Sequence, residues 1–149
     1  MTDIRFYHLQ QQSLEQALPL LLRKALDNGK RILVRTGDKN YIEGLSEALW
    51  GYRNHGFIPH GAVDDAHSED QPVLLTAAME NLNKADMLVL TGGSDNSDIA
   101  DYSLCCEMLN GHNADEVQTA RAHWKAYKEA GHSITYWKQT DNGGWEQKA

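Results

Sequence analysis

The chain has 149 residues, of which 41% are hydrophobic, and a formal net charge of −7. This length suits one globular domain, and the acidic balance argues against a nucleic-acid-binding surface, which is usually basic. We therefore expect no strong direct binding to nucleic acid. No apolar run approaches the ~20 residues that span a bilayer, and the first residues lack the apolar core of a signal peptide. We expect a cytoplasmic protein without membrane contact.

The two cysteines, Cys105 and Cys106, are adjacent in an apolar stretch. Neighbouring cysteines make a poor structural staple, and the sequence offers no other cysteine to pair with them. We interpret them as small core residues of a protein from a reducing compartment.

The first part of the chain alternates strand and helix patterns. Ile4–Leu9 is short and rich in β-branched and aromatic residues, which predicts a strand. Apolar residues then recur at helical spacing from an N-cap at Ser13 as far as Ala25. Pro19 interrupts this pattern, so either the helix bends there or it begins there. Arg31–Arg35 predicts a buried parallel strand.

The rest of the chain continues the alternation. The spacing predicts helices over 41–52, 99–109 and 114–130, strands over 73–76, 87–91 and 134–137, and a loop over 55–67. Residues 139–149 are polar, and we expect them to form a frayed tail after a single domain of residues 1–138. This order predicts an α/β fold of nucleotidase-like or Rossmann-like topology, in which a mostly parallel sheet carries helices on both faces.

Two loops, Thr36–Asp38 and Thr91–Asp95, follow predicted strands, where α/β proteins bind their ligands. Neither loop matches the dinucleotide fingerprint or the Walker loop with its lysine, and both carry aspartates, which repel phosphate. We favour glycine turns, with Ser97 or Asp98 capping a helix. A small enzyme acting on a nucleotide or a phosphate ester is the alternative.

Seven histidines raise the question of a metal site. No pair has HExxH spacing, although His55 and His60 share a loop with Asp64 and Asp65. A GxSxG nucleophile elbow is also missing from the sequence. We therefore expect no metal, no cofactor and no catalytic residues.

The helix predicted over 114–130 and the strand after it combine cations with apolar side chains. Four helical residues share one stripe, a lysine flanks it, and two strand residues follow: Val117, Arg121, Trp124, Lys128, Lys125, Ile134 and Tyr136. Such a surface suits a peptide with carboxylates and a hydrophobic end. Alternatively, Trp124 is a core residue and the basic residues only favour the C-terminal half of a helix; spacing alone does not decide.

Aromatic residues gather around a loop that contains glycine and proline: Trp50, Tyr52, Phe57, Ile58 and Pro59. Aromatic residues are enriched at protein interfaces. The other reading is a loop folded over the core.

Between Arg5 and Trp137 the chain resembles the chi subunits of bacterial DNA polymerase III. The matching segments, in the order of the family, are Arg5–Tyr7, Gly29–Val34, Glu47–Trp50, Phe57–His60, Trp124–Lys128 and Ala130-Gly131. The resemblance implies a non-catalytic accessory of the clamp-loader complex with a nucleotidase-like fold.

The resemblance also implies two protein partners. One is the C-terminal tail of single-stranded DNA-binding protein, which ends in acidic residues followed by an aromatic residue with a free carboxylate. Its site maps onto Arg121 and Trp124, with Ile134 and Tyr136 as walls. The best-studied members of the family have a lysine one turn before this arginine, where this chain has Val117.

Lys125 or Lys128 would then have to supply the positive charge that Val117 lacks.

The second implied partner is the psi subunit or an equivalent clamp-loader subunit. It maps onto the loop region occupied by Trp50, Phe57, Ile58 and Pro59.

Overall fold

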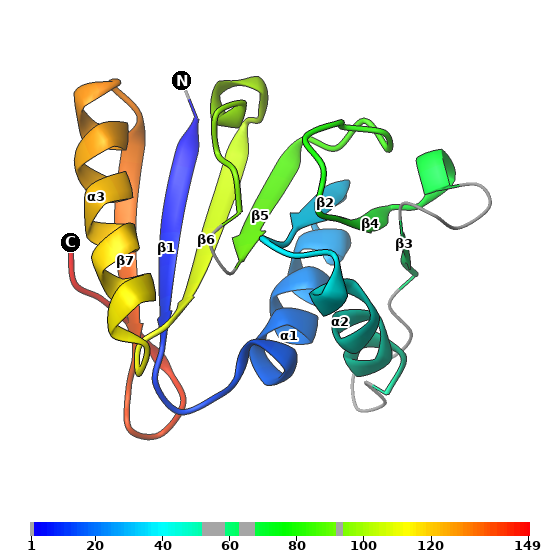
Figure 1. The fold of residues 1–149 in the computed structure, drawn as a ribbon. Helices are drawn as coiled ribbons and strands as arrows, with labels where there is room; N and C mark the ends of the chain where they lie inside the picture. Colours follow the sequence, from blue (N-terminus) through cyan, green and yellow to red (C-terminus); the bar gives the residue numbers. More distant parts are fainter. Residues whose placement is uncertain (1, 52–58, 63–67, 92–93) are drawn as a thin grey trace.

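The computed structural model describes residues 2–51, 59–62, 68–91 and 94–149. Within these ranges one eight-stranded sheet has the order β3-β4-β2-β5-β6-β1-β7-β8, and every neighbouring pair is parallel except β7 and β8 (Figure 1). The strands are β1 (Asp3–Leu9), β2 (Ile32–Arg35), β3 (Gly61–Ala62), β4 (Val73–Thr76), β5 (Met87–Thr91), β6 (Leu104–Asn110), β7 (Ser133–Gln139) and β8 (Trp145–Gln147).

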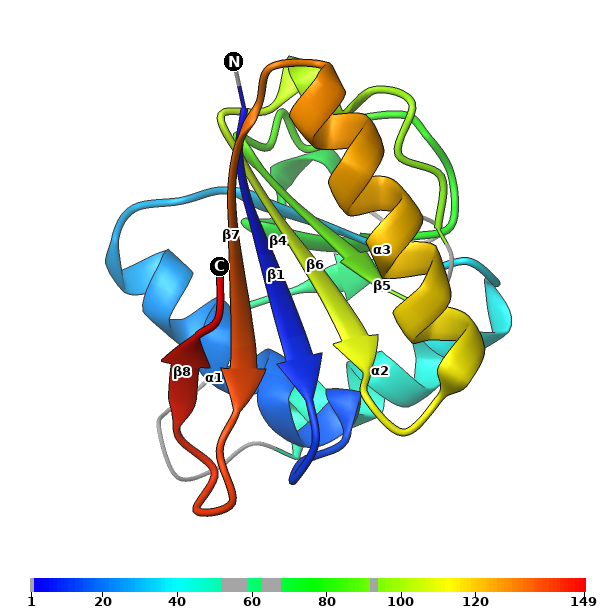
Figure 2. The same ribbon diagram turned by 90° about the vertical axis from the view of Figure 1, so that its left-hand side faces the viewer.

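Helices cover both faces of the sheet, which confirms the predicted α/β architecture. Helices α1 (Leu14–Asp27) and α2 (Asn40–Trp50) lie on one face, and α3 (Ala114–Glu129) lies on the other (Figures 1 and 2). The central strands β2, β4 and β5 are buried along their whole length. Because successive side chains of a strand point to opposite faces, each face has its own apolar core, one under α1 and α2 and the other under α3.

Helix α1 begins upstream of its proline. Ser13 forms a capping box with Gln16, and the helix runs through Pro19 to Asp27. The alternative in which the helix begins at Pro19 is therefore wrong. The cap satisfies backbone groups of the first turn, and the buried proline ring packs with the apolar side of the helix.

Residues 99–109 do not form the predicted helix. A short 3-10 turn at Ile99–Asp101 precedes β6, which lies between β5 and β1 in the sheet. A strand buried on both faces is a continuous apolar run, and such a run also fits a helical period. Burial explains the cysteines as well: Cys105 and Cys106 are both buried in β6, and burial raises the pKa of the Cys106 thiol to about 12.

The tail is more ordered than its composition predicts. After a turn in which the Thr140 amide donates to the Gly144 carbonyl at 2.8 Å, β8 pairs antiparallel with β7. Trp145 packs edge-on against Tyr7, with 5.1 Å between the ring centroids. In the described part of the chain, none of the helices has the length and apolarity needed to cross a bilayer.

Candidate functional site

The basic stripe predicted on the last helix lies along one side of α3. Asn113 caps this helix by accepting hydrogen bonds from the amides of Asp115 and Glu116. Arg121 and Lys128 of the stripe and the flanking Lys125 are exposed, whereas Val117 and Trp124, the two apolar residues of the stripe, are half-buried against the core beneath α3. Both readings of Trp124 hold in part, since its ring packs on the core and also borders the exposed cations.

Aromatic rings form the floor beside this stripe. Phe6 of β1 is fully buried and stacks on Tyr136 of β7, with 5.7 Å between centroids and 20° between planes. Trp124 meets Tyr136 edge-on at 6.0 Å and Phe6 at 5.7 Å. Ile134 lies two residues before Tyr136 on the same face of β7 and packs against the same core. The structure therefore brings the predicted wall residues together with Trp124.

Two residues that spacing did not reveal complete this cluster. His8 of β1 is buried, and its Nδ1 lies 2.6 Å from the Tyr136 hydroxyl. Lys138 aligns with His8 in the β1–β7 ladder and lies on the Tyr136 face of β7. For Lys138 the sequence offered two signals, its i, i+2 spacing from Tyr136 and its place in a segment, residues 117–138, that is rich in lysine and arginine.

Cations from two elements act on His8 and Tyr136. Burial, followed by the charges of Lys138, His112 and Arg121, lowers the pKa of His8. Burial raises the pKa of Tyr136; the charge of Arg121 opposes that rise and the charge of Glu107 adds to it. Among the described residues, neither Arg121 nor Lys138 forms a salt bridge. Two unpaired cations from different elements thus lie close to one aromatic cluster.

The second predicted surface is only partly described. Trp50 is 58% exposed at the end of α2, and its ring lies 4.8 Å from that of His60, which in turn lies 3.0 Å from the Ser46 hydroxyl through Nε2. Pro59 is half-buried next to His60. Phe57, Ile58 and Tyr52 lie outside the described residues. This surface is on the sheet face opposite α3.

The edge of the sheet where α/β proteins bind nucleotides is occupied by an internal ion pair. Arg35, at the end of β2, is 1% exposed and donates to both carboxylate oxygens of Asp98, at 2.7 and 2.9 Å. Its remaining donors reach the carbonyls of Ala78, Met79 and Asp95. All the guanidinium N–H groups are used, so none is left for a phosphate.

These contacts correct the helix-capping interpretation of Asp98. Its side chain makes no capping hydrogen bond to the 3-10 turn and pairs with Arg35 instead. Asp38 does act as a turn residue, because its carboxylate accepts from the Asn40 amide at 2.9 Å. Gly92 and Gly93 of the other candidate loop lie outside the described residues.

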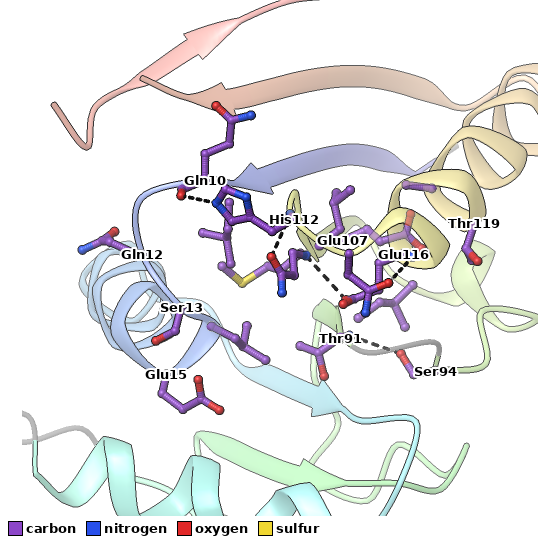
Figure 3. A pocket seen from close by; sticks show the side chains of 18 of the residues that line it. Gln10, Gln12, Ser13, Glu15, Thr91, Ser94, Glu107, His112, Glu116 and Thr119 are labelled. Carbon is purple, nitrogen blue, oxygen red and sulfur yellow. Dashed lines mark hydrogen bonds between the residues drawn. The ribbon is translucent and has the colours of Figure 1, made fainter. Parts of the chain in front are cut away.

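A cleft of about 780 Å³ opens beside this edge, between the N-terminal ends of α1 and α3 (Figure 3). Its described lining contains no lysine or arginine and four acidic residues, Glu15, Glu107, Asp115 and Glu116. Glu107 accepts from His123 Nδ1 at 2.5 Å, and this hydrogen bond raises the pKa of His123. The charge of the cleft does not favour a phosphate ester.

The described histidines are dispersed and each has its own hydrogen bond. The partners of His8, His60, His112, His123 and His132 are, respectively, Tyr136, Ser46, the Gln10 carbonyl, Glu107 and the Thr2 amide. No three His, Cys, Asp or Glu residues of the described ranges gather as metal ligands would. His55, Asp64 and Asp65 of the loop considered for a metal lie outside those ranges.

Comparison with known proteins assigns the family. The family model described as "DNA polymerase III chi subunit, HolC" matches residues 1–135. This chain belongs to the family of DNA polymerase III chi subunits. A probable DNA polymerase III subunit chi from Rickettsia prowazekii is 30% identical over 95 residues, which span 64% of this chain and 58% of that protein. A DNA polymerase III subunit chi from Pseudomonas aeruginosa is 24% identical over 137 residues, which span 90% and 94%.

The family assignment confirms the resemblance found in the sequence. It places this chi-family chain in DNA replication, as a non-catalytic subunit of DNA polymerase III. The alternative of a nucleotide or phosphate-ester enzyme loses its support, because Arg35 is fully engaged and the cleft is acidic.

Proposed function

We propose that this chi-family chain is an adaptor that binds the acidic C-terminal tail of single-stranded DNA-binding protein with one face and a clamp-loader subunit with the other. The observation that carries the first half is the pair of unpaired cations, Arg121 and Lys138, beside the ring of Tyr136. Leaving these two cations unpaired does not stabilise the fold of a chain that has a net charge of −7 and therefore many carboxylates.

The chemistry of the tail complements this surface. Arginine grips a carboxylate with two parallel hydrogen bonds, and Arg121 is exposed on α3 where a peptide can reach it. The half-buried rings of Trp124 and Tyr136 offer an apolar floor for the aromatic end of the tail. Lys125 lies one turn beyond Arg121 and extends the cationic row along the helix.

The second half of the proposal uses the surface around Trp50. A tryptophan that is 58% exposed at a helix end is a candidate anchor for a protein partner. Because α2 and α3 lie on opposite faces of the sheet (Figure 1), the two partners would not compete for space. We propose a psi-like clamp-loader subunit as the partner at Trp50, Phe57, Ile58 and Pro59.

A charge reversal tests the tail site. Arg121→Glu should weaken binding of a fluorescent tail peptide at least tenfold, about 1.4 kcal/mol, since an attraction becomes a repulsion. Binding to the unchanged protein should also weaken with added salt. Lys24→Glu, at an exposed position of α1, is the matched control because it changes the net charge equally and should leave the affinity unchanged.

Circular dichroism serves as the folding control. The helix should survive the change, because position 121 is exposed and glutamate is a good helix former. Equal peptide affinity for folded Arg121→Glu and the unchanged protein would place the tail site elsewhere.

The partner at the Trp50 surface is tested separately. Trp50→Ala should release clamp-loader subunits in a pull-down from cell extract and retain single-stranded DNA-binding protein, whereas Arg121→Glu should do the reverse. Truncating a buried interface aromatic typically costs about 2 kcal/mol or more of binding free energy. Loss of both partners by one variant would argue against two separate surfaces.

A further inference from the structure

Lys138 lies near the end of α3 at which the stripe supplies no positive charge. Helix α3 runs antiparallel to β7, so the end of β7 lies near the beginning of the helix (Figure 2). At that end the stripe on α3 begins with the uncharged Val117. Lys138, on the same face of β7 as Tyr136, is therefore the strand's cation opposite the uncharged start of the stripe.

The strand register also brings this cation beside His8, because Lys138 aligns with His8 in the β1–β7 ladder. The charges that oppose protonation of His8 are, in order, those of Lys138 on β7, His112 after β6 and Arg121 on α3. His112 is already engaged, because its Nε2 lies 2.7 Å from the Gln10 carbonyl oxygen. Among the described residues, Lys138 on β7 and Arg121 on α3 remain as cations without a salt bridge whose charges act on His8.

A peptide that ends in an aromatic residue presents two groups from a single carbon, the ring and the terminal carboxylate. If the ring lies on the floor made by Tyr136 and Trp124, the carboxylate must lie at the edge of that floor. The preceding acidic residues must then leave in the other direction, where Arg121, Lys125 and Lys128 follow one another along α3.

We infer that Lys138 holds the terminal carboxylate of the bound tail, while Arg121 and the lysines of α3 hold the acidic side chains before it. This assignment rests on the proposed tail binding and adds to it the direction of the peptide and a residue that the helix pattern did not include. Lysine acts here as a point charge on a flexible stem, which suits a single carboxylate at the end of a chain.

A binding cycle with two peptides tests the assignment. One probe is a labelled tail peptide of the cell's own single-stranded DNA-binding protein, and the other is the same peptide with a C-terminal amide. Lys138→Gln should weaken binding of the free-acid peptide by about threefold to tenfold and should leave binding of the amide unchanged, because the amide has already lost the group that Lys138 holds.

The matched variant is Lys125→Gln, which removes an equal charge from α3. It should weaken binding of both peptides by the same factor, because it acts on acidic side chains that both peptides keep. Lys138→Arg should restore the discrimination between acid and amide. Circular dichroism and the melting temperature establish that all three variants are folded.

The outcomes separate this assignment from the function on which it rests. Tail binding that Arg121→Glu weakens but Lys138→Gln does not overturns the role of Lys138 alone. Equal loss of both peptides in Lys138→Gln also overturns it, since a general attraction is then sufficient. If the unchanged protein binds neither peptide, the tail site itself is wrong, and the assignment of Lys138 with it.

Discussion

The two sides of α3 use charge in opposite ways. On the side facing β7, Arg121 and Lys138 have no anionic partner among the described residues. On the side facing the cleft, His123 is paired with Glu107 at 2.5 Å, and Tyr127 hydrogen-bonds Asn96 at 2.8 Å. In the described part of the chain, cations without an ionic partner thus lie on the β7 side of α3, whereas His123, Glu107 and Tyr127 on the cleft side are hydrogen-bonded to one another.

This difference supports the proposed binding surface on the β7 side of α3. A charge that is already paired inside the fold gains little from a ligand and loses its first partner in exchange. The cations beside Tyr136 carry no such cost, so an acidic peptide can pair with them without breaking an ion pair among the described residues. The presence of a cleft is therefore a weaker indication of function in this molecule than the pairing state of its charged side chains.

The largest effect is expected from Phe6, which supports both sides of α3. Its ring is fully buried, and its centroid lies 5.8 Å from that of Tyr127 on the cleft side and 5.7 Å from that of Tyr136 on the β7 side. The β7 side, where we propose that the tail binds, is called the peptide side below. Phe6→Ala should lower the free energy of unfolding by about 3–5 kcal/mol, measured by urea denaturation. Phe6→Leu, which keeps most of the volume, should cost less.

The peptide side and the cleft side should weaken together in Phe6→Ala, because both tyrosines lose the same neighbour. Tail affinity and the NMR signals of the His123 ring report on the two sides. A folded Phe6→Ala protein in which only one side changes would show that the two sides do not depend on a common floor.

A smaller effect that is confined to the peptide side is expected from Gly111. A Cβ at this position would overlap His8 Nε2 and lie 2.6 Å from the Leu9 carbonyl oxygen. Gly111→Ala should cost about 1–3 kcal/mol of stability and weaken tail binding, because His8 cannot move without disturbing Tyr136. Thermal unfolding and the peptide titration measure the two effects.

Gly44 of α2 provides the control for that substitution. A Cβ there meets nothing within 4 Å, so Gly44→Ala should stabilise the helix by about 0.4–1 kcal/mol. Unchanged tail binding and stability in Gly111→Ala would contradict the close contact between this turn and His8.

The sequence predicted the alternation of strands and helices but missed elements whose evidence is tertiary. Strand β6 is buried on both faces and, apart from Glu107 and the terminal Asn110, apolar, so its pattern also fits a helix. Strand β8 has polar neighbours in the sequence, and its order comes from pairing with β7 and from the contact between Trp145 and Tyr7. Local composition does not encode either kind of contact.

The candidate site likewise contains residues that a local pattern predicted and contacts that only the fold reveals. The spacing of Arg121 and Trp124 was sufficient to place them on one side of α3, because the helical period links them directly. His8 joins Tyr136 across 128 residues of sequence, and only the β1–β7 register reveals that contact. Arg35 similarly finds Asp98 63 residues away, a partner that no local pattern indicates.

The smallest predicted effect is a difference in pH dependence between the histidines on the two sides of α3. The hydrogen bond to Glu107 raises the pKa of His123 in the folded protein. Its contribution to stability is therefore complete below the unfolded value of about 6.5 and is lost as the pH rises through the folded pKa. Burial lowers the pKa of His8 in the folded protein. The resulting loss of stability is absent above about pH 6.5 and grows as the pH falls towards the folded pKa, because the unfolded chain binds the proton first.

The two substitutions should therefore change the slope of the free energy of unfolding against pH in opposite directions. Urea denaturation between about pH 5 and 8 should show that His123→Gln loses stability mainly at the acidic end, by less than about 1 kcal/mol because the pair is partly exposed to solvent. His8→Asn should instead flatten the acidic decline of the unchanged protein. The comparison uses slopes and not absolute stabilities, because His8→Asn also removes the partner of the Tyr136 hydroxyl. Slopes of the same sign for both variants would mean that the two sides of α3 do not hold their histidines in different charge states.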